Sequence, residues 1–166
     1  SETVFYETTV GGDYTAPSWV TADLSRSGSG SSATYELAVD DGRVLEFDGD
    51  GALTSITDRN GYVQEYVYAA GKLDLVRDVD SGRELDVDWQ GSGVSSVTDP
   101  EGGSVSYVYG DGNGNLTDVT DISGGEWHFA YDGGHRLTHM RDAYQSTQAV
   151  PAETVNEYDS AGRVSE

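Results

Sequence analysis

The chain has 166 residues, with 30 acidic against 9 basic side chains, a formal charge of −21 and no cysteine. A chain of this length can form one domain with a core of its own. The charge repels phosphate backbones and anionic lipid surfaces, which argues against nucleic acid as a partner. The absence of cysteine excludes disulfides, thiolate nucleophiles and cysteine-bound zinc. No apolar run reaches the length of a membrane span, so we expect no membrane insertion.

Residues 1–46 fit the repeat poorly, and we expect residues 1–40 to form a divergent N-terminal strand or cap segment. Within it, Thr3–Val10 and Thr34–Val39 have the composition of β-strands. Residues 26–32 (RSGSGSS) consist mostly of glycine and serine, which predicts a flexible loop.

From residue 41 to residue 166 the sequence repeats a pattern of about 21 residues. Each unit begins with an aromatic residue, passes through a turn to Leu-x-x-[Val/Ile]-x-Asp and a glycine, and ends in a strand. The opening aromatics are Phe47, Tyr68, Trp89, Tyr109, Tyr131 and Tyr158. The recurring aspartates are Asp58, Asp78, Asp99, Asp121 and Asp142. Such repetition is typical of units that are stable only when stacked on their neighbours.

Each unit has the pattern of a β-hairpin. In residues 58–61 (DRNG), Asn and Gly tolerate the positive φ angles of a tight turn. The strand that follows alternates, which puts Tyr66 and Tyr68 on one face. The three-residue offset between Leu53 and Ile56 breaks strict alternation and predicts a bulge or bend in every unit. The sequence therefore predicts an all-β fold, in which tandem hairpins form one long, twisted, antiparallel meandering sheet, curled or spiral.

Two units depart from the regular length. The insertion 145–153, which contains Pro151, lengthens the fifth unit and predicts a surface loop. The sixth unit is truncated at Glu166, halfway through a hairpin. We expect the edge strand left there to pair with another strand.

Residues 131–137 (YDGGHRL) and 158–164 (YDSAGRV) resemble the YD dipeptide repeat of the RHS/YD-repeat family, and residues 53–61 (LTSITDRNG) resemble the body of that repeat. The resemblance covers residues 41–166. Members of this family are large secreted or surface proteins whose repeats spiral into a hollow β-shell. Bacterial members often enclose a toxin, and animal relatives use the shell in cell adhesion. The resemblance implies a repeat-shell segment with an extracellular location, secreted or at the cell surface.

We therefore expect a non-enzymatic structural module that builds a β-sheet shell or scaffold by hairpin stacking. Its partner would be protein, either another copy of the chain or the remainder of a larger shell. One alternative is a self-assembling extracellular filament protomer, joined to its neighbours by strand addition at open sheet edges. A further alternative is a surface adhesion or glycan-binding module, since aromatic rings can stack on sugars.

The recurring aspartates raise the question of catalysis by paired carboxylates. Catalysis needs a unique constellation, whereas these aspartates return in every unit, so we interpret them as capping residues of the turns that follow. The recurring aromatics are interpreted in the same way, as packing residues. We assign no catalytic, cofactor-binding or metal-binding residue.

Three other features could suggest a ligand site. His128, His135 and His139 lie in one unit, but the His135–His139 spacing suits a helix and this segment has the pattern of turn and strand. Residues 48–51 (DGDG) and 111–115 (DGNGN) resemble calcium loops without the glutamate that an EF-hand needs. We expect no cofactor beyond loose Ca²⁺ binding to the acidic surface. Asn115-Leu116-Thr117 is a sequon, which makes Asn115 a candidate N-glycosylation site.

Overall fold

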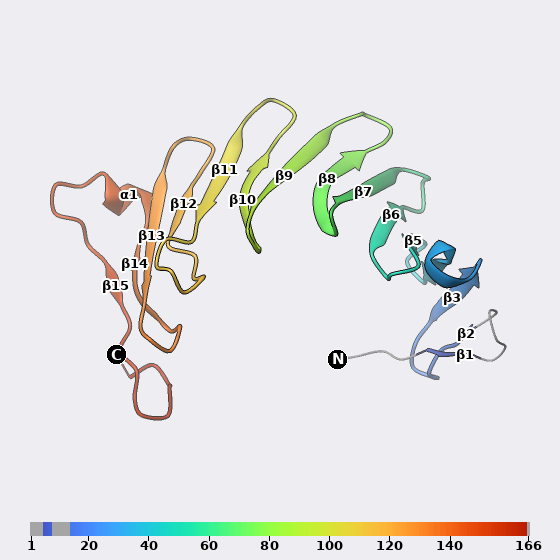
Figure 1. Ribbon diagram of the computed structural model, residues 1–166, viewed down its shortest axis with the longest axis horizontal. Coiled ribbons are helices and arrows are strands. Elements are labelled where there is room, and N and C mark those ends of the chain that lie inside the picture. Colours follow the sequence, from blue (N-terminus) through green and yellow to red (C-terminus); the bar gives the residue numbers. More distant parts are fainter. Residues whose placement is uncertain (1–4, 8–13, 166) are drawn as a thin grey trace. The chain divides into compact units, whose positions relative to one another are not determined.

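The fold is given by a computed structural model that describes residues 5–7 and 14–165. Most of its regular structure is β (Figure 1). A small two-stranded sheet pairs β1 (Tyr6–Glu7) with β2 (Tyr14–Thr15). The remainder of the predicted strand Thr3–Val10 lies largely outside the described residues.

The other thirteen strands form one antiparallel meander in strict chain order. They are β3 (Ala22–Ser27), β4 (Thr34–Val39), β5 (Val44–Phe47), β6 (Leu53–Thr57), β7 (Val63–Ala69), β8 (Lys72–Asp78), β9 (Glu84–Gln90), β10 (Gly93–Thr98), β11 (Ser104–Val108), β12 (Asp118–Thr120), β13 (Glu126–Tyr131), β14 (Leu137–Arg141) and β15 (Thr154–Val155). The predicted all-β meander of tandem hairpins is confirmed. The chain divides into two compact units, Ser1–Leu85 and Asp86–Glu166, which we describe separately.

In the first unit, apolar residues face one another across successive strands. Leu45 on β5 pairs with Leu37 on β4 and with Ile56 on β6. Tyr66 on β7 pairs in the same way with Val76 on β8. Directly opposed apolar side chains of this kind are the main stabilising contacts within a sheet.

The second unit continues the pattern with its own apolar row. Val97 on β10 pairs with Val87 on β9 and Val105 on β11. Val119 on β12 then pairs with Tyr107 and with Trp127 on β13. The alternate positions carry mostly polar residues on the opposite face, as the period-two pattern predicts, with Val108 as an exception.

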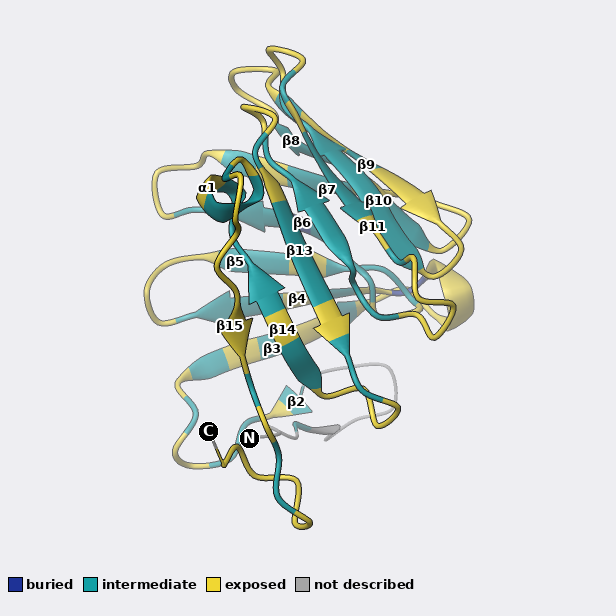
Figure 2. Ribbon diagram, turned by 90° about the vertical axis from the view of Figure 1, so that its left-hand side faces the viewer, coloured by how far each residue is buried: buried dark blue, intermediate teal, exposed yellow. Residues whose placement is uncertain are grey.

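Burial in this sheet is shallow on both faces. Among the described residues only Ala33 and Ser55 are buried, at 1% and 7% exposure, and no large side chain is fully buried. Figure 2 shows strands of intermediate burial joined by exposed turns. The sheet therefore owes its order to pairing between neighbouring strands and to its turns.

The predicted bulges are present in four hairpins. The register shifts where Phe47, Tyr68, Trp89 and Tyr131 pair with the strand that follows. At two bulges the extra residue is a threonine, and its hydroxyl donates a hydrogen bond to a carbonyl of the preceding strand. Thr54 bonds to Glu46 at 3.2 Å and Thr138 bonds to Ala130 at 3.1 Å. These side-chain bonds hold the residue that the ladder leaves unpaired.

Two segments outside the regular hairpins have structure of their own. Residues 26–32, where the sequence predicts a flexible loop, hold the last two residues of β3 and the single 3₁₀ turn η1 (Gly30–Ser32). This turn lies so close to Gly49 that a Cβ there would be 2.8 Å from the Ser31 carbonyl oxygen. The insertion 145–153 begins inside the short helix α1 (Ala143–Ser146), and its remainder has no regular structure.

The β7–β8 turn gives the first testable prediction. Its central residues Ala70 and Gly71 both have positive φ, 51° and 75°. Such a turn favours Asn or Gly at both positions, and the left-handed conformation costs other residues about 1–2 kcal/mol. We predict that Ala70→Asn raises the free energy of unfolding by about 0.5–1 kcal/mol in urea denaturation. Ala69→Asn, one position earlier in β7, is the control and should bring no gain. A loss of stability in the Ala70 variant would contradict this prediction.

Candidate functional site

The turn that follows β6 shows how an aspartate closes a hairpin in this chain. The backbone N–H of Asp58 donates to the Tyr62 carbonyl at 2.9 Å, and that of Gly61 donates to the Asp58 carbonyl at 3.0 Å. The Asp58 carboxylate oxygen Oδ1 accepts the N–H groups of Asn60 at 2.7 Å and Tyr62 at 3.0 Å. One side chain thus satisfies two donors inside the turn.

The same set of four bonds closes six turns, which we call the Asp turns. They begin at Asp48, Asp58, Asp99, Asp121, Asp132 and Asp159. Asp58, Asp99 and Asp121 belong to the recurring aspartates of the sequence pattern. The other three follow the opening aromatic of their units. The same aspartate hydrogen bonds are therefore used both in turns after an opening aromatic and in turns at a recurring aspartate.

Two of the recurring aspartates act in variant turns. Asp78 closes a loop that is one residue longer, where its Oδ1 accepts both the N–H and the hydroxyl of Ser81 at 2.7 Å. Asp142 is the N-cap of α1, and its side chain accepts the N–H of Gln145 at 2.7 Å. All five recurring aspartates thus accept backbone N–H groups through their side chains, as a capping role requires.

Sequence reasoning placed residues 48–51 in a tight turn but assigned no capping role to the side chains of Asp48, Asp132 and Asp159. The signal was available, because Asp48-x-x-Gly51 and Asp159-x-x-Gly162 share the spacing of the Asp58 turn. In the Asp132 turn the fourth position is His135, which adopts φ 62°, a left-handed angle that glycine adopts far more easily. Because histidine stands where the other turns have glycine, the Asp-x-x-Gly pattern does not detect the Asp132 turn.

Arginine strengthens two of the Asp turns. While Oδ1 of Asp132 accepts turn N–H groups, its Oδ2 accepts Nε of Arg136 at 2.8 Å and lies 2.6 Å from Nη2. Arg163 contacts Asp159 in the same way, with both distances 2.9 Å. The Arg136 guanidinium also lies over the Tyr158 ring, 4.9 Å from its centre, and so connects two successive units.

These bonds stabilise the charged carboxylates. Hydrogen bonds from the Arg136 side chain, and then from its backbone N–H, lower the pKa of Asp132 to about 2. The backbone N–H and then the guanidinium of Arg163 lower the pKa of Asp159. Bonds from Ser81, first its N–H and then its hydroxyl, lower the pKa of Asp78. Each of these aspartates is therefore held in the ionised form in which it accepts hydrogen bonds.

The opening aromatics share one pairing rule. Each of five pairs across its turn with the first apolar residue of its own unit: Phe47 with Leu53, Tyr68 with Leu73, Trp89 with Val94, Tyr131 with Leu137 and Tyr158 with Val164. Tyr68 and Trp89 are 38% and 36% exposed, and the other opening aromatics are half-buried. The pairing supports a packing role and leaves part of each ring accessible.

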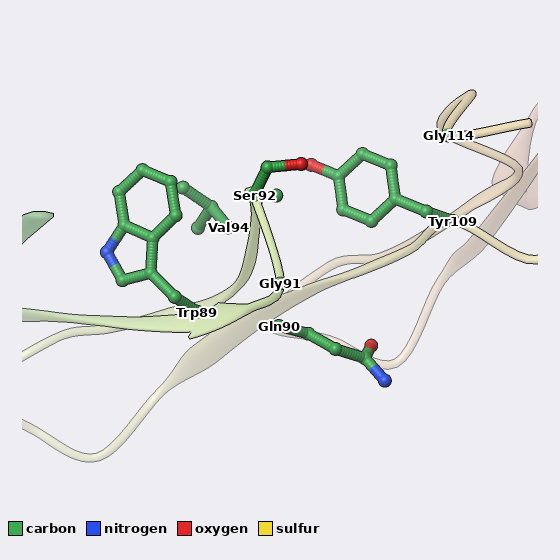
Figure 3. Close-up of a pocket in the computed structure, with 8 residues that line it drawn as sticks. Trp89, Gln90, Gly91, Ser92, Val94, Tyr109 and Gly114 are labelled. Atoms are coloured by element: carbon green, nitrogen blue, oxygen red, sulfur yellow. The ribbon is translucent and has the colours of Figure 1, made fainter.

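An open hollow of about 540 Å³ lies in the second unit, beside the β9–β10 turn. It is lined by Trp89, Gln90, Gly91, Ser92, Gly93, Val94, Tyr109 and Gly114. Tyr109 covers Gly93 so closely that a Cβ there would lie 2.5 Å from the ring atom Cε2. Figure 3 shows Trp89 and Tyr109 on either side of the turn, on the face opposite to Gln90. We call this feature the aromatic hollow.

Comparison with known proteins identifies the repeat. Residues 110–147 match the family model described as RHS Repeat. An RHS repeat thus occupies residues 110–147. No curated protein matches the sequence. The chain resembles the crystal structure of TcdB2-TccC3-TEV with a TM-score of 0.57 and 16% sequence identity. The match covers 86% of this chain but only 8% of that one, so this chain spans a small part of the length of its structural relative. The RHS/YD-repeat resemblance in the sequence is thus confirmed.

The three histidines each contact a different neighbour. His128 Nδ1 lies 2.5 Å from Asp118 Oδ1, and its Nε2 lies 3.8 Å from Glu126. His135 Nδ1 bonds to Asn115 Oδ1 at 2.8 Å, and His139 Nδ1 bonds to Thr138 at 3.1 Å. In the part of the chain that the structure describes, no three His, Asp or Glu side chains are grouped so as to hold a metal ion.

The side chain of Asn115, in the sequon, is engaged at both ends. Its Nδ2 donates to Asp111 Oδ2 at 2.5 Å, and its Oδ1 bonds to His135. The sequon hydroxyl of Thr117 donates to the Val108 carbonyl at 3.1 Å. A glycan on Asn115 would replace one of the two hydrogens of Nδ2 and leave one N–H for the bond to Asp111. Separately, no helix in residues 5–7 or 14–165 is long and apolar enough to cross a membrane.

The close contact of Tyr109 with Gly93 gives the second prediction. Gly93→Ala would force the ring away, and we predict a loss of about 1–3 kcal/mol in the free energy of unfolding. Gly133→Ala is the matched control, because a Cβ there meets no atom within 4 Å. Urea denaturation should place that control within about 0.5 kcal/mol of the parent chain. Equal effects of the two substitutions would contradict the tight packing at Gly93.

The third prediction concerns the charge on Asp132. Because its pKa falls from 3.8 to about 2 on folding, its ionised form stabilises the chain above pH 4, and this contribution disappears as the pH falls through 2. We predict that Asp132→Asn lowers the melting temperature at pH 6. The difference from the parent chain should shrink steadily between pH 4 and pH 2.

The control is Asp50→Asn, which removes the same charge from an exposed turn position. Asn60 occupies the corresponding position of the Asp58 turn, so asparagine is compatible with that site. A gap between parent and Asp132→Asn that stays constant from pH 6 to pH 2 would contradict the role of the carboxylate charge.

Proposed function

We propose that this RHS-repeat chain is a non-enzymatic structural segment of a larger secreted or cell-surface β-shell. The observation that carries the proposal is the shallow burial of a regularly paired sheet. Thirteen strands are in register, yet in the described part of the chain only Ser55 on β6 and Ala33 after η1 are buried. A sheet of this kind gains further burial when additional hairpins or an enclosed chain cover its faces.

The comparison supports the same interpretation. A similarity that covers most of this chain but 8% of a much longer one is what a strip of a large sheet would give. The RHS repeat at residues 110–147 lies within that strip. In this proposal the chain forms part of the wall of the shell, and any activity of the whole assembly belongs to other parts of it.

The chemistry of the described residues agrees with a structural role. The aspartates that recur along the chain are used in turns, and the aromatics pair within their own hairpins, so neither set forms a unique catalytic group. We propose that the partners are protein, either the remainder of the shell or an enclosed chain. An acidic exterior of charge −21 would keep such a structure soluble and away from nucleic acid.

A filament is the second candidate. The sheet ends at different strands, β3 and β15, so that one copy could in principle add to the end of the next. The two-residue length of β15 argues against this edge as a strong template, because short edge strands discourage pairing. We therefore rank the shell segment above the filament.

The fourth prediction separates these functions. The purified chain is examined by light scattering after size exclusion and by negative-stain electron microscopy, at low and high salt and over a hundredfold range of concentration. A shell segment should give small discrete particles under all conditions. It should also bind a hydrophobic dye, because its apolar face is incompletely covered. Regular filaments would overturn the shell proposal in favour of the second candidate.

A further inference from the structure

The sequence contains two Asn-Gly pairs, Asn60-Gly61 and Asn113-Gly114, and both are exposed. Asparagine is among the thermolabile residues of proteins. It is most reactive when glycine follows it, because the glycine nitrogen can approach the asparagine side chain without a Cβ in the way. Sequence and exposure alone would make the two pairs equally reactive, so a difference between them has to come from the hydrogen bonds that each pair makes.

The reaction in question converts asparagine to an acid without an enzyme. The backbone nitrogen of the following glycine loses its proton to a base in the solvent and forms a bond to the side-chain carbonyl carbon of asparagine. The bond from that carbon to the side-chain nitrogen breaks, and the nitrogen leaves as ammonia. Water then opens the cyclic imide at either of its two carbonyls, which gives aspartate or isoaspartate. The glycine N–H must therefore be available for the reaction to begin.

The turn that begins at Asp58 holds both reacting groups of the first pair. The Gly61 N–H donates to the Asp58 carbonyl oxygen at 3.0 Å, which withholds the attacking nitrogen. The Asn60 side-chain nitrogen Nδ2 donates to Asp58 Oδ2 at 3.2 Å, which restrains the group under attack. Reaction at Asn60 therefore requires the turn to open first, at the cost of these two hydrogen bonds.

The second pair lies in the connection between β11 and β12, where the glycine nitrogen is not held. The Gly114 N–H meets no acceptor within the described part of the chain, and a Cβ on Gly114 would meet no atom within 4 Å. Asn113 is anchored through its backbone N–H, which donates to Asp111 Oδ1 at 2.9 Å. Its side-chain amide is the weakest of the groups that lower the pKa of Asp111. The attacking nitrogen and the carbon that it attacks are both accessible here.

We propose that Asn113 is a site of spontaneous deamidation in the folded chain, whereas Asn60 is protected by its Asp turn. The modification needs only water and a base, and it does not depend on the proposed shell function. Either proposal could fail without the other.

The product would disturb a link between two neighbouring connections of the sheet. Asp111 accepts the Asn115 N–H at 3.3 Å and the Asn115 side-chain amide at 2.5 Å, and Asn115 Oδ1 bonds to His135 Nδ1 at 2.8 Å in the turn after β13. Isoaspartate at position 113 lengthens the main chain by one carbon between Asp111 and Asn115, and its new carboxylate repels that of Asp111. We expect the link to His135 to loosen. Since Gly114 lines the aromatic hollow, that surface would change as well.

The test compares the complete folded chain with the same chain unfolded in urea, both incubated in one mildly alkaline buffer. Peptide mass spectrometry follows the conversion of amide to acid at Asn60 and Asn113, and an isoaspartate assay identifies the product. In urea the two rates should agree within about threefold, because no turn protects either pair. In the folded chain Asn113 should react about tenfold faster than Asn60 or more, because only the reaction at Asn60 has to break two additional hydrogen bonds.

The matched variant is Asn113→Gln, whose longer side chain would have to close a larger ring. It should form no product at this position and leave the rate at Asn60 unchanged, and circular dichroism should show both chains folded. In NMR spectra the Asn115 side-chain amide signals should change as the parent chain ages and stay constant in the variant. The proposal would be overturned if Asn113 in the folded chain reacted no faster than Asn60, or if it persisted there while reacting in urea.

Discussion

The structure depends on one interaction, the acceptance of two turn N–H groups by a single aspartate carboxylate. In the Asp99 turn those donors are Glu101 and Gly103, at 2.9 and 2.7 Å. Each turn reverses the chain within four residues and fixes the register of the two strands that it joins. The same local bonds recur at the β5–β6, β6–β7, β10–β11, β12–β13 and β13–β14 connections, and so fix the register of much of the meander.

A sheet held together by local turns has particular consequences for stability and function. With few buried residues, no deep core aligns distant parts of the chain, and each hairpin rests mainly on its neighbours. The faces of the sheet are therefore surfaces that contact something else, such as more sheet or an enclosed chain. Acidic side chains confer solubility, while the apolar rows provide the contacts.

The sequence predicted the repeat, the hairpins, the bulges and the RHS resemblance, because all of these arise from short-range periodicity. It did not predict the packing of Tyr109 on Gly93, since that contact depends on the register of two strands joined by a turn. The Asp132 turn was missed because His135 replaces the glycine that marks the others. In residues 26–32 composition predicted a loop, whereas contact with Gly49 accompanies a helical turn there. Short-range sequence patterns thus predict the strands and turns, whereas the packing around Tyr109 depends on contacts between strands that are not visible in the sequence.

The most direct test of this account is amide hydrogen exchange, measured by NMR on Asp58→Ala. Arg59→Ala is the control, because it keeps the Cβ that lies against Gly42 and leaves the carboxylate in place. The account predicts that Asp58→Ala abolishes protection of the Asn60 and Tyr62 amides and reduces it at the adjoining ends of β6 and β7, whereas Arg59→Ala changes none of these. Unchanged protection at Tyr62 in the Asp58 variant would contradict the claim that carboxylate-capped turns hold the sheet together.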